Sequence, residues 1–223
     1  MCEVAIVAAL RREVAGLVKG WRRVRREFGS STFEFFESGK TVVVCGGIGA
    51  EAARRAAEAI IALYQPAEVI SVGLAGALQD GLPAGSLVEA ATVIDARDSS
   101  RMAIGGGSGI LVSCTSVAGE EQKQKLARAY AAQAVDMEAA SVGKGAQAHG
   151  LRFRAIKVVS DELDFPMPSM NRFVSHDGHF RSAEFALYAA ARPWTWRAVL
   201  RLARNSAKAS RVLCDRLKVL TDA

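Results

Sequence analysis

The feature that most constrains this chain is a pair of apolar, strand-like segments that end on acidic side chains. Residues 134–140 (AVDMEAA) lead to two carboxylates, and residues 156–161 (IKVVSD) end on a third. Open α/β sheets bring the side chains at their strand ends into one crevice. The sequence therefore predicts that Glu138 and Asp161 meet at one site.

Strand-like and helix-like segments alternate along the rest of the chain, which predicts an α/β layered fold. The pattern predicts strands at residues 3–9, 41–45, 68–74, 86–94, 110–113, 134–137 and 154–160. It predicts helices at residues 51–64, 120–131, 138–149 and 183–191. Because no repeat or linker interrupts this alternation, we expect a single domain over residues 1–223.

Composition sets a few further limits. A chain of 223 residues can bury a large core without disulfides, and we expect its four dispersed cysteines to be reduced thiols. The N-terminus lacks the features of a signal peptide, and no apolar run is long enough to span a membrane, so we expect a cytoplasmic protein. The net charge of +6 favours anionic partners.

Two further polar clusters have simple interpretations. The basic cluster at residues 19–26 is short and lacks a recognition fold, so we expect a solvated surface and no nucleic-acid binding. His176 and His179 lack companion cysteines or suitably spaced acids, so we expect no metal site.

The two acidic motifs occur together with the glycine-rich segments 46–49 (GGIG) and 71–76 (SVGLAG). This combination resembles the nucleoside phosphorylase/nucleosidase superfamily, especially its methylthioadenosine/S-adenosylhomocysteine nucleosidase branch, over residues 3–164. The resemblance implies a three-layer fold with a central mixed sheet flanked by helices. It also implies cleavage of a purine nucleoside at its N-glycosidic bond, no cofactor, and a homodimer.

The resemblance assigns roles to individual residues. Asp161 matches the aspartate that protonates or hydrogen-bonds N7 of the leaving purine, although Ser160-Asp161 alone would also suit a helix or turn cap. Met137 matches a methionine that packs on the ribose, and Glu138 matches a glutamate that accepts hydrogen bonds from its hydroxyls. An acid in the first turn of a helix is the simpler interpretation of Glu138. The remaining expected substrate-binding residues are Gly47, Gly73, Leu74, Ala75 and Ser160, with Gly73 in a tight central turn that also includes Gly76.

The residues after the first strand leave the nucleophile open. Glu13 aligns with the acid that activates water in the nucleosidases, whereas Arg11 and Arg12 are suited to binding inorganic phosphate as a co-substrate. Nucleosidases usually carry acids at these arginines and a serine at Leu74, but the phosphate-binding signature of the hexameric phosphorylases is also absent. The balance leans slightly towards phosphorolysis, and Arg11 and Arg12 suit a solvated helix start equally well.

The C-terminal third differs from the small nucleosidases. Residues 165–174 are apolar and rich in methionine and proline, which suits a pocket for a greasy 5′ substituent. Together with residues 192–206, this segment resembles the hopanoid-associated phosphorylases and implies a lipid-tailed nucleoside such as adenosylhopane. The basic terminal helix, with Trp194 and Trp196 before it, suits peripheral contact with a membrane, but packing on the sheet is the favoured interpretation. A non-catalytic protein that binds a nucleoside or lipid remains the alternative to an enzyme.

Overall fold

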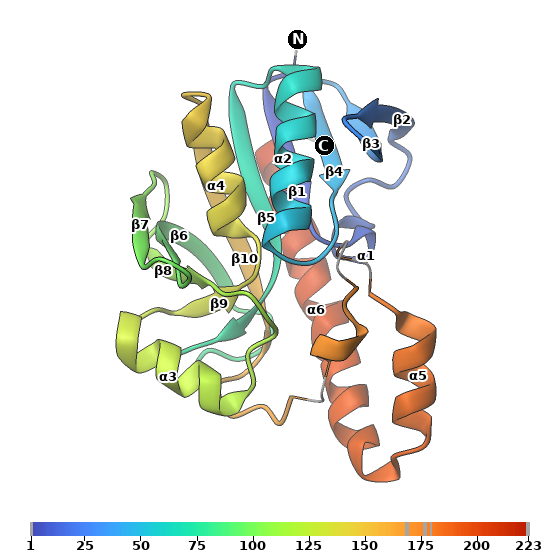
Figure 1. The fold of residues 1–223 in the computed structure, drawn as a ribbon, viewed down its shortest axis with the longest axis vertical. Helices are drawn as coiled ribbons and strands as arrows, with labels where there is room; N and C mark the ends of the chain where they lie inside the picture. The colour runs from blue at the N-terminus through green and yellow to red at the C-terminus, as the bar shows by residue number, and fades with distance from the viewer. Residues whose placement is uncertain (1, 168–169, 176–177, 179, 222–223) are drawn as a thin grey trace.

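The computed structural model describes residues 2–167, 170–175, 178 and 180–221, which form a mixed sheet flanked by helices (Figure 1). The strands are β1 (Val4–Ala8), β2 (Arg22–Phe28), β3 (Ser31–Ser38), β4 (Thr41–Cys45), β5 (Glu68–Ala77), β6 (Leu87–Asp95), β7 (Ser100–Ala103), β8 (Gly109–Ser113), β9 (Ala134–Asp136) and β10 (Arg152–Asp161). The helices are α1 (Arg11–Val14), α2 (Ala50–Tyr64), α3 (Glu120–Tyr130), α4 (Ala139–Ala148), α5 (Ser182–Ala190) and α6 (Trp196–Thr221). Two short 3₁₀ helices, η1 (Asn171–Phe173) and η2 (Pro193–Thr195), flank α5.

The strand β5 organises the sheet. It pairs in parallel with β1 and β10 and, at its carboxyl end, antiparallel with β9. The strand order β10-β6-β8-β9-β5-β1-β4-β3-β2, with the extra β10–β5 pairing, closes one half of the sheet into a ring. Because β1, β4, β5 and β10 run in the same direction, their carboxyl ends lie at one edge of the sheet.

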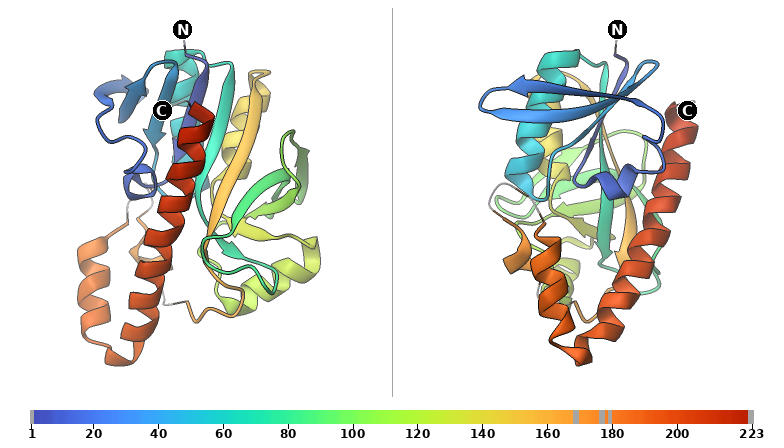
Figure 2. Two further views of the ribbon diagram at one scale, coloured as in Figure 1. Left: turned by 180° about the vertical axis from the view of Figure 1, so that it is seen from behind. Right: turned by 90° about the vertical axis from the view of Figure 1, so that its right-hand side faces the viewer.

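The helices cover both faces of the sheet, which confirms the predicted three-layer α/β fold (Figure 2). On one face α2 and α4 pack together, and fully buried Ile60 belongs to that core. On the other face the C-terminal half of α6 packs against β10 and β5 through Leu213 and Leu217. These two leucines lie four residues apart, so they share the face of α6 that meets the sheet.

One local expectation needs correction, and a second is confirmed. Gly73 and Gly76 were expected in a turn, but both lie inside strand β5. The basic cluster at residues 19–26 includes the start of β2, which forms an antiparallel pair with β3. Its arginines are exposed, as expected for a solvated surface. They form ion pairs with the glutamates of β3 and stay outside the core. None of the described helices is long and apolar enough to cross a bilayer.

Candidate active site

A cavity of about 740 Å³ opens at the carboxyl ends of β1, β5, β9 and β10, with α6 forming one wall. Glu13, Glu138 and Asp161 all line it, so the carboxylates that the sequence places at separate strand ends do meet. Met137, Gly73, Leu74, Ala75 and Ser160 line the same cavity. Its outer part is apolar, with walls from the chain between β10 and α5, from α5 and from α6. These residues include Met167, Met170, Phe180, Phe185, Val199 and Leu202.

Glu13 is a buried carboxylate on the short helix α1. The chain turns directly after β1, so α1 carries the side chain back over the strand ends, and the backbone N–H of Leu10 donates to Glu13 Oε2 at 3.2 Å. Burial raises the pKa of Glu13, and the Leu10 N–H and the charge of Lys157 offset part of that rise. A carboxylate whose pKa is moved towards neutrality is a better proton acceptor than one in water.

Glu138 lies at the N-terminus of α4 and is held by two backbone groups. Gly49 N–H donates to Oε1 at 2.7 Å and Met137 N–H donates to Oε2 at 3.2 Å. Burial, followed by the charge of Asp136, raises the pKa of Glu138 to about 7. Each carboxylate oxygen has two lone pairs, so both retain the capacity to accept a hydrogen bond from a ligand hydroxyl.

Asp136 forms an ion pair with Lys157 underneath Glu138. The Lys157 ammonium lies 2.9 Å from Asp136 Oδ2, and both side chains are almost completely buried. Burial lowers the pKa of Lys157, but the charges of Asp136 and Glu138 outweigh that effect and raise it overall. Because Asp136 also accepts hydrogen bonds from Ser113 Oγ and from Ala139 N–H, it holds the start of α4 in place.

Asp161 has its own buried lysine. Lys123 on α3 donates to Asp161 Oδ2. Its ammonium also donates to the carbonyl oxygen of Glu162, and Lys123 Nζ lies 2.6 Å from that oxygen. On the other side of the carboxylate, Ser160 Oγ donates to Asp161 Oδ1 at 2.6 Å. Lys123 is only 1% exposed, so this ion pair forms part of the cavity wall.

Glycines in β5 make room for both lysines. A Cβ on Gly76 would lie 2.8 Å from Lys123 Cε and 3.0 Å from Asp161 Oδ2. A Cβ on Gly73 would lie 3.2 Å from Glu13 Oε2 and 3.6 Å from Lys157 Nζ, and the backbone there has a φ of +148°. These glycines therefore act by leaving space in a strand and not by forming a turn.

The arginines next to Glu13 lie in different surroundings. Arg12 lines the cavity and its guanidinium lies over the Phe180 ring, 5.7 Å from the centroid. Arg11 is outside the cavity lining and lies over the Phe36 ring at 5.2 Å. Gly47 is also outside the lining, whereas the next residue, Ile48, belongs to it. The structure thus brings Arg12, but not Arg11, to the predicted site.

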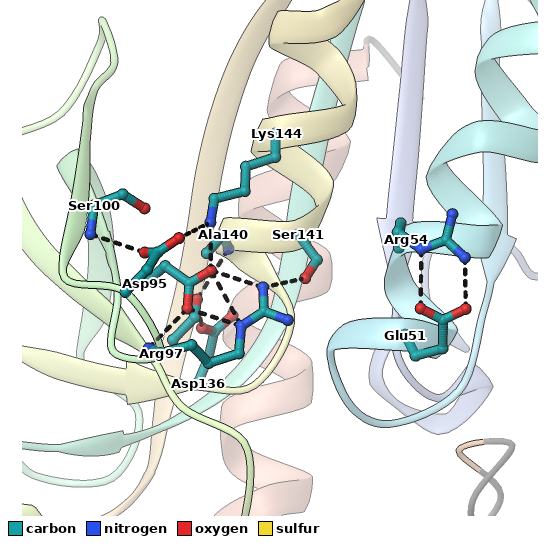
Figure 3. Close-up of polar contacts among 11 residues, drawn as sticks. Glu51, Arg54, Asp95, Arg97, Ser100, Asp136, Ala140, Ser141 and Lys144 are labelled. Carbon is teal, nitrogen blue, oxygen red and sulfur yellow. Dashed lines mark hydrogen bonds and ion pairs between the residues drawn. The ribbon is translucent and has the colours of Figure 1, made fainter.

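A second polar network anchors α4 from the side of β6 (Figure 3). Asp95, at the end of β6, accepts hydrogen bonds from Arg97 and from Lys144 of α4, both at 2.7 Å. Arg97 also reaches Ser141 Oγ at 3.4 Å. The Arg97 guanidinium beside Asp95 holds the pKa of that carboxyl well below its usual range. Because Asp95 lies outside the cavity lining, this network supports α4 and does not face a ligand.

Sequence reasoning missed Lys123 and Lys157 as site residues. Lys157 gave a signal, because a lysine interrupts an otherwise apolar strand, whereas Lys123 sits in the polar segment EEQKQK of α3. Across the described residues, no group of three or more His, Cys, Asp or Glu side chains is arranged to hold a metal ion. His176 and His179 lie outside the described residues.

The fold and this arrangement of carboxylates are those of an enzyme-type crevice at the strand ends of an α/β sheet. Sequence comparison then gives the family: the phosphorylase superfamily matches residues 3–113 and 102–191, so the chain belongs to that superfamily. A comparison with curated proteins finds no match.

Solved structures with the same fold include a futalosine hydrolase and two nucleosidases. A futalosine hydrolase mutant of Helicobacter pylori has 16% identity and a TM-score of 0.75, with 100% of this chain and 99% of that chain covered. The 5′-methylthioadenosine/S-adenosylhomocysteine nucleosidase of H. pylori has 17% identity and a TM-score of 0.74, covering 99% and 98%. The corresponding nucleosidase of Neisseria meningitidis, in complex with methylthio-immucillin-A, has 19% identity and a TM-score of 0.70, covering 96% of each chain.

Proposed function

We propose that this protein hydrolyses the N-glycosidic bond of an adenine nucleoside that carries an apolar 5′ substituent. The observation that carries the proposal is the convergence of Glu13, Glu138 and Asp161 in one cavity whose outer walls are apolar. Membership of the phosphorylase superfamily and the shared fold with nucleosidases and a futalosine hydrolase support the reaction class.

Each of the three carboxylates has a separate role in this reaction. As the glycosidic bond lengthens, positive charge develops on the ribose and negative charge on the base. Glu138 accepts hydrogen bonds from the ribose hydroxyls and stabilises the cationic sugar. Asp161 hydrogen-bonds the leaving base and passes it a proton drawn from the Lys123 ammonium, which donates to Oδ2, while Ser160 fixes the other oxygen. Glu13 takes a proton from the nucleophilic water.

The surroundings of Glu13 favour water over phosphate as the nucleophile. Glu13 is buried beside Gly73, where a carboxylate would repel a phosphate dianion but would accept a proton from water. The nearby Lys157 ammonium is already paired with Asp136. The slight preference for phosphorolysis rested on the Arg11-Arg12 pair, the missing serine at Leu74 and the C-terminal region. We now favour hydrolysis, because Arg11 lies outside the cavity.

Phosphorolysis remains the second candidate, and one observation favours it. Arg12 and Arg211 both line the cavity and are exposed, so their guanidinium groups are available to an anion. Two charge-assisted contacts could hold inorganic phosphate at the cavity wall.

The apolar outer part of the cavity supports a large 5′ substituent. Methionine and aromatic side chains from residues 165–185 face aliphatic side chains of α6 across it. A methylthio group would fill little of a cavity of about 740 Å³. We therefore propose a lipid-tailed adenosine, of the kind that the resemblance to the hopanoid-associated phosphorylases implies, as the better substrate.

The test measures adenine release and the sugar product from methylthioadenosine and from an alkyl-tailed adenosine, each with and without phosphate. We expect free sugar as the product in phosphate-free buffer, and a higher kcat/KM for the tailed nucleoside. Glu13→Gln and Asp161→Asn should each lower turnover by about 10²–10⁴-fold, because each removes a proton-transfer group. A strict phosphate requirement with a sugar 1-phosphate product, lost in Arg12→Ala, would assign phosphorolysis instead. Absence of adenine release from every nucleoside would favour a binding protein.

A further inference from the structure

The helical hairpin at the C-terminus extends beyond the body of the protein (Figures 1 and 2). It consists of α5, the turn η2 and the N-terminal half of α6. The C-terminal half of α6 is anchored on the sheet, with Ala209, Leu213 and Leu217 fully buried. Along α5 only Ala189 is buried, so the hairpin has little support from the core.

The hairpin exposes most of the large apolar side chains that the described residues leave in solvent. Leu187 is 73% exposed, Trp194 77%, Trp196 49% and Leu200 57%. Outside the hairpin, the described residues add only Leu87 and Val219 to this set. Single exposed apolar residues need no explanation, but a cluster at one projecting tip marks a surface for a partner.

The charge of the same segment indicates which partner fits. Between Glu184 and Asp215 the chain contains no acidic residue. The six basic residues of this stretch are Arg192, Arg197, Arg201, Arg204, Lys208 and Arg211. Two copies of such a surface would repel each other in a symmetric contact, whereas an anionic surface would attract it.

We propose that the tip of the α5–α6 hairpin docks on an anionic lipid bilayer. Tryptophan and leucine next to arginine on a projecting helical element is the composition of an interfacial membrane anchor, in which the rings lie at headgroup depth. Arginines around them add attraction to anionic headgroups. The hairpin lies on the bilayer and does not cross it, since no described helix could span it.

The hairpin also connects this surface to the cavity. Phe185, Val199 and Leu202 line the apolar part of the cavity, and Leu187 and Leu200, their near neighbours in sequence, are exposed on the outside. The same helices therefore border both surfaces. If the proposed function holds, docking places the apolar cavity next to the membrane in which a lipid-tailed nucleoside would reside.

The test is co-sedimentation of the full chain with vesicles of phosphatidylcholine alone or with phosphatidylglycerol added. We expect binding to the anionic vesicles that weakens in high salt. Trp194→Ser/Leu200→Ser should weaken it by at least about tenfold, because both side chains insert at the interface. Arg197→Ser/Arg204→Ser should weaken it by about 30-fold, since each basic residue near an anionic surface contributes about fivefold.

Matched controls separate the tip from general surface properties. Val219 is 72% exposed at the other end of α6, and Arg22 and Arg25 are exposed on β2. Val219→Ser and Arg22→Ser/Arg25→Ser should leave vesicle binding unchanged. Activity on methylthioadenosine should be the same in the tip variants as in the parent protein, because a water-soluble substrate needs no membrane. Vesicle binding does not depend on turnover, so it tests docking even if the proposed reaction is wrong.

Three results would overturn the docking proposal. The first is no binding of the parent protein to anionic vesicles at low salt. The second is equal loss of binding in the tip variants and in the controls. The third is a dimer in sedimentation velocity that dissociates in Trp194→Ser/Leu200→Ser, which would assign the surface to a second copy of the chain.

Discussion

The strongest prediction concerns Lys123, which has no counterpart in the sequence motifs. We predict that Lys123→Met lowers the free energy of unfolding by about 3–5 kcal/mol at pH 7, the usual cost of removing one partner from a buried ion pair. The exposed fractions of the Lys123 and Asp161 side chains are 1% and 6%. Methionine has a similar length and shape, so the variant removes the charge and its hydrogen bonds to Asp161 and Glu162 without opening a large cavity.

The assay is urea unfolding in a double-mutant cycle with Asp161→Asn. The double variant should recover at least about 2 kcal/mol relative to the sum of the single losses, because no buried charge remains unpaired in it.

Lys125→Met on the same helix is the matched control. Lys125 is 73% exposed and pairs with Glu121 one turn away, so its loss should cost less than about 0.5 kcal/mol. A loss below about 1 kcal/mol in Lys123→Met would refute the reasoning. Strictly additive effects in the cycle would also refute it, because they would show that Lys123 and Asp161 do not interact.

Two further predictions concern Glu138 and Gly76. Glu138→Gln should reduce turnover less on 2′-deoxy nucleosides than on ribonucleosides. It should also be more stable relative to the parent above pH 7 than at pH 5, since a carboxyl whose pKa is raised to about 7 loses stabilisation as the pH rises through that value. Gly76→Ala should lower kcat by at least about tenfold because its Cβ collides with Lys123 and Asp161, whereas Gly105→Ala, with open space around it, should be neutral in both activity and thermal unfolding.

The regular elements of the fold were predictable because their periodicity is strong. The strand at residues 41–45 and the helix at 51–64 appear as β4 and α2 within one residue of the expected bounds. The β2–β3 hairpin was not predicted, because four arginines on β2 suggest a solvated surface rather than a strand. Those arginines lie over Glu34 and Glu37 of β3, and such cross-strand pairing depends on a neighbour that the local sequence does not identify.

The carboxylates of the site were predictable, but the groups that control their charge were not. Asp161 ends β10, which runs parallel to β5, and Glu138 follows β9, which pairs with the carboxyl end of β5, so both carboxylates lie at the same end of β5. Lys123 comes from α3, whose local pattern is that of an exposed helix, and it is buried only because β10 ends above it. The space for it comes from Gly76, a third segment of the chain. No single stretch of sequence contains this information.

The distribution of the two lysines explains how four buried carboxylates share one site. Asp136 and Asp161 each have a lysine, whereas Glu13 and Glu138, which have none of their own, are the ones whose pKa is raised. The ion pairs therefore hold Asp136 and Asp161 in position and leave Glu13 and Glu138 sensitive to what enters the cavity. Binding of a sugar cation beside Glu138 would favour its ionised form, and a water molecule beside Glu13 would meet a base whose pKa is raised by burial. This division of charge suits the proposed cleavage of a nucleoside, and it depends on Lys123 and Lys157 as much as on the carboxylates themselves.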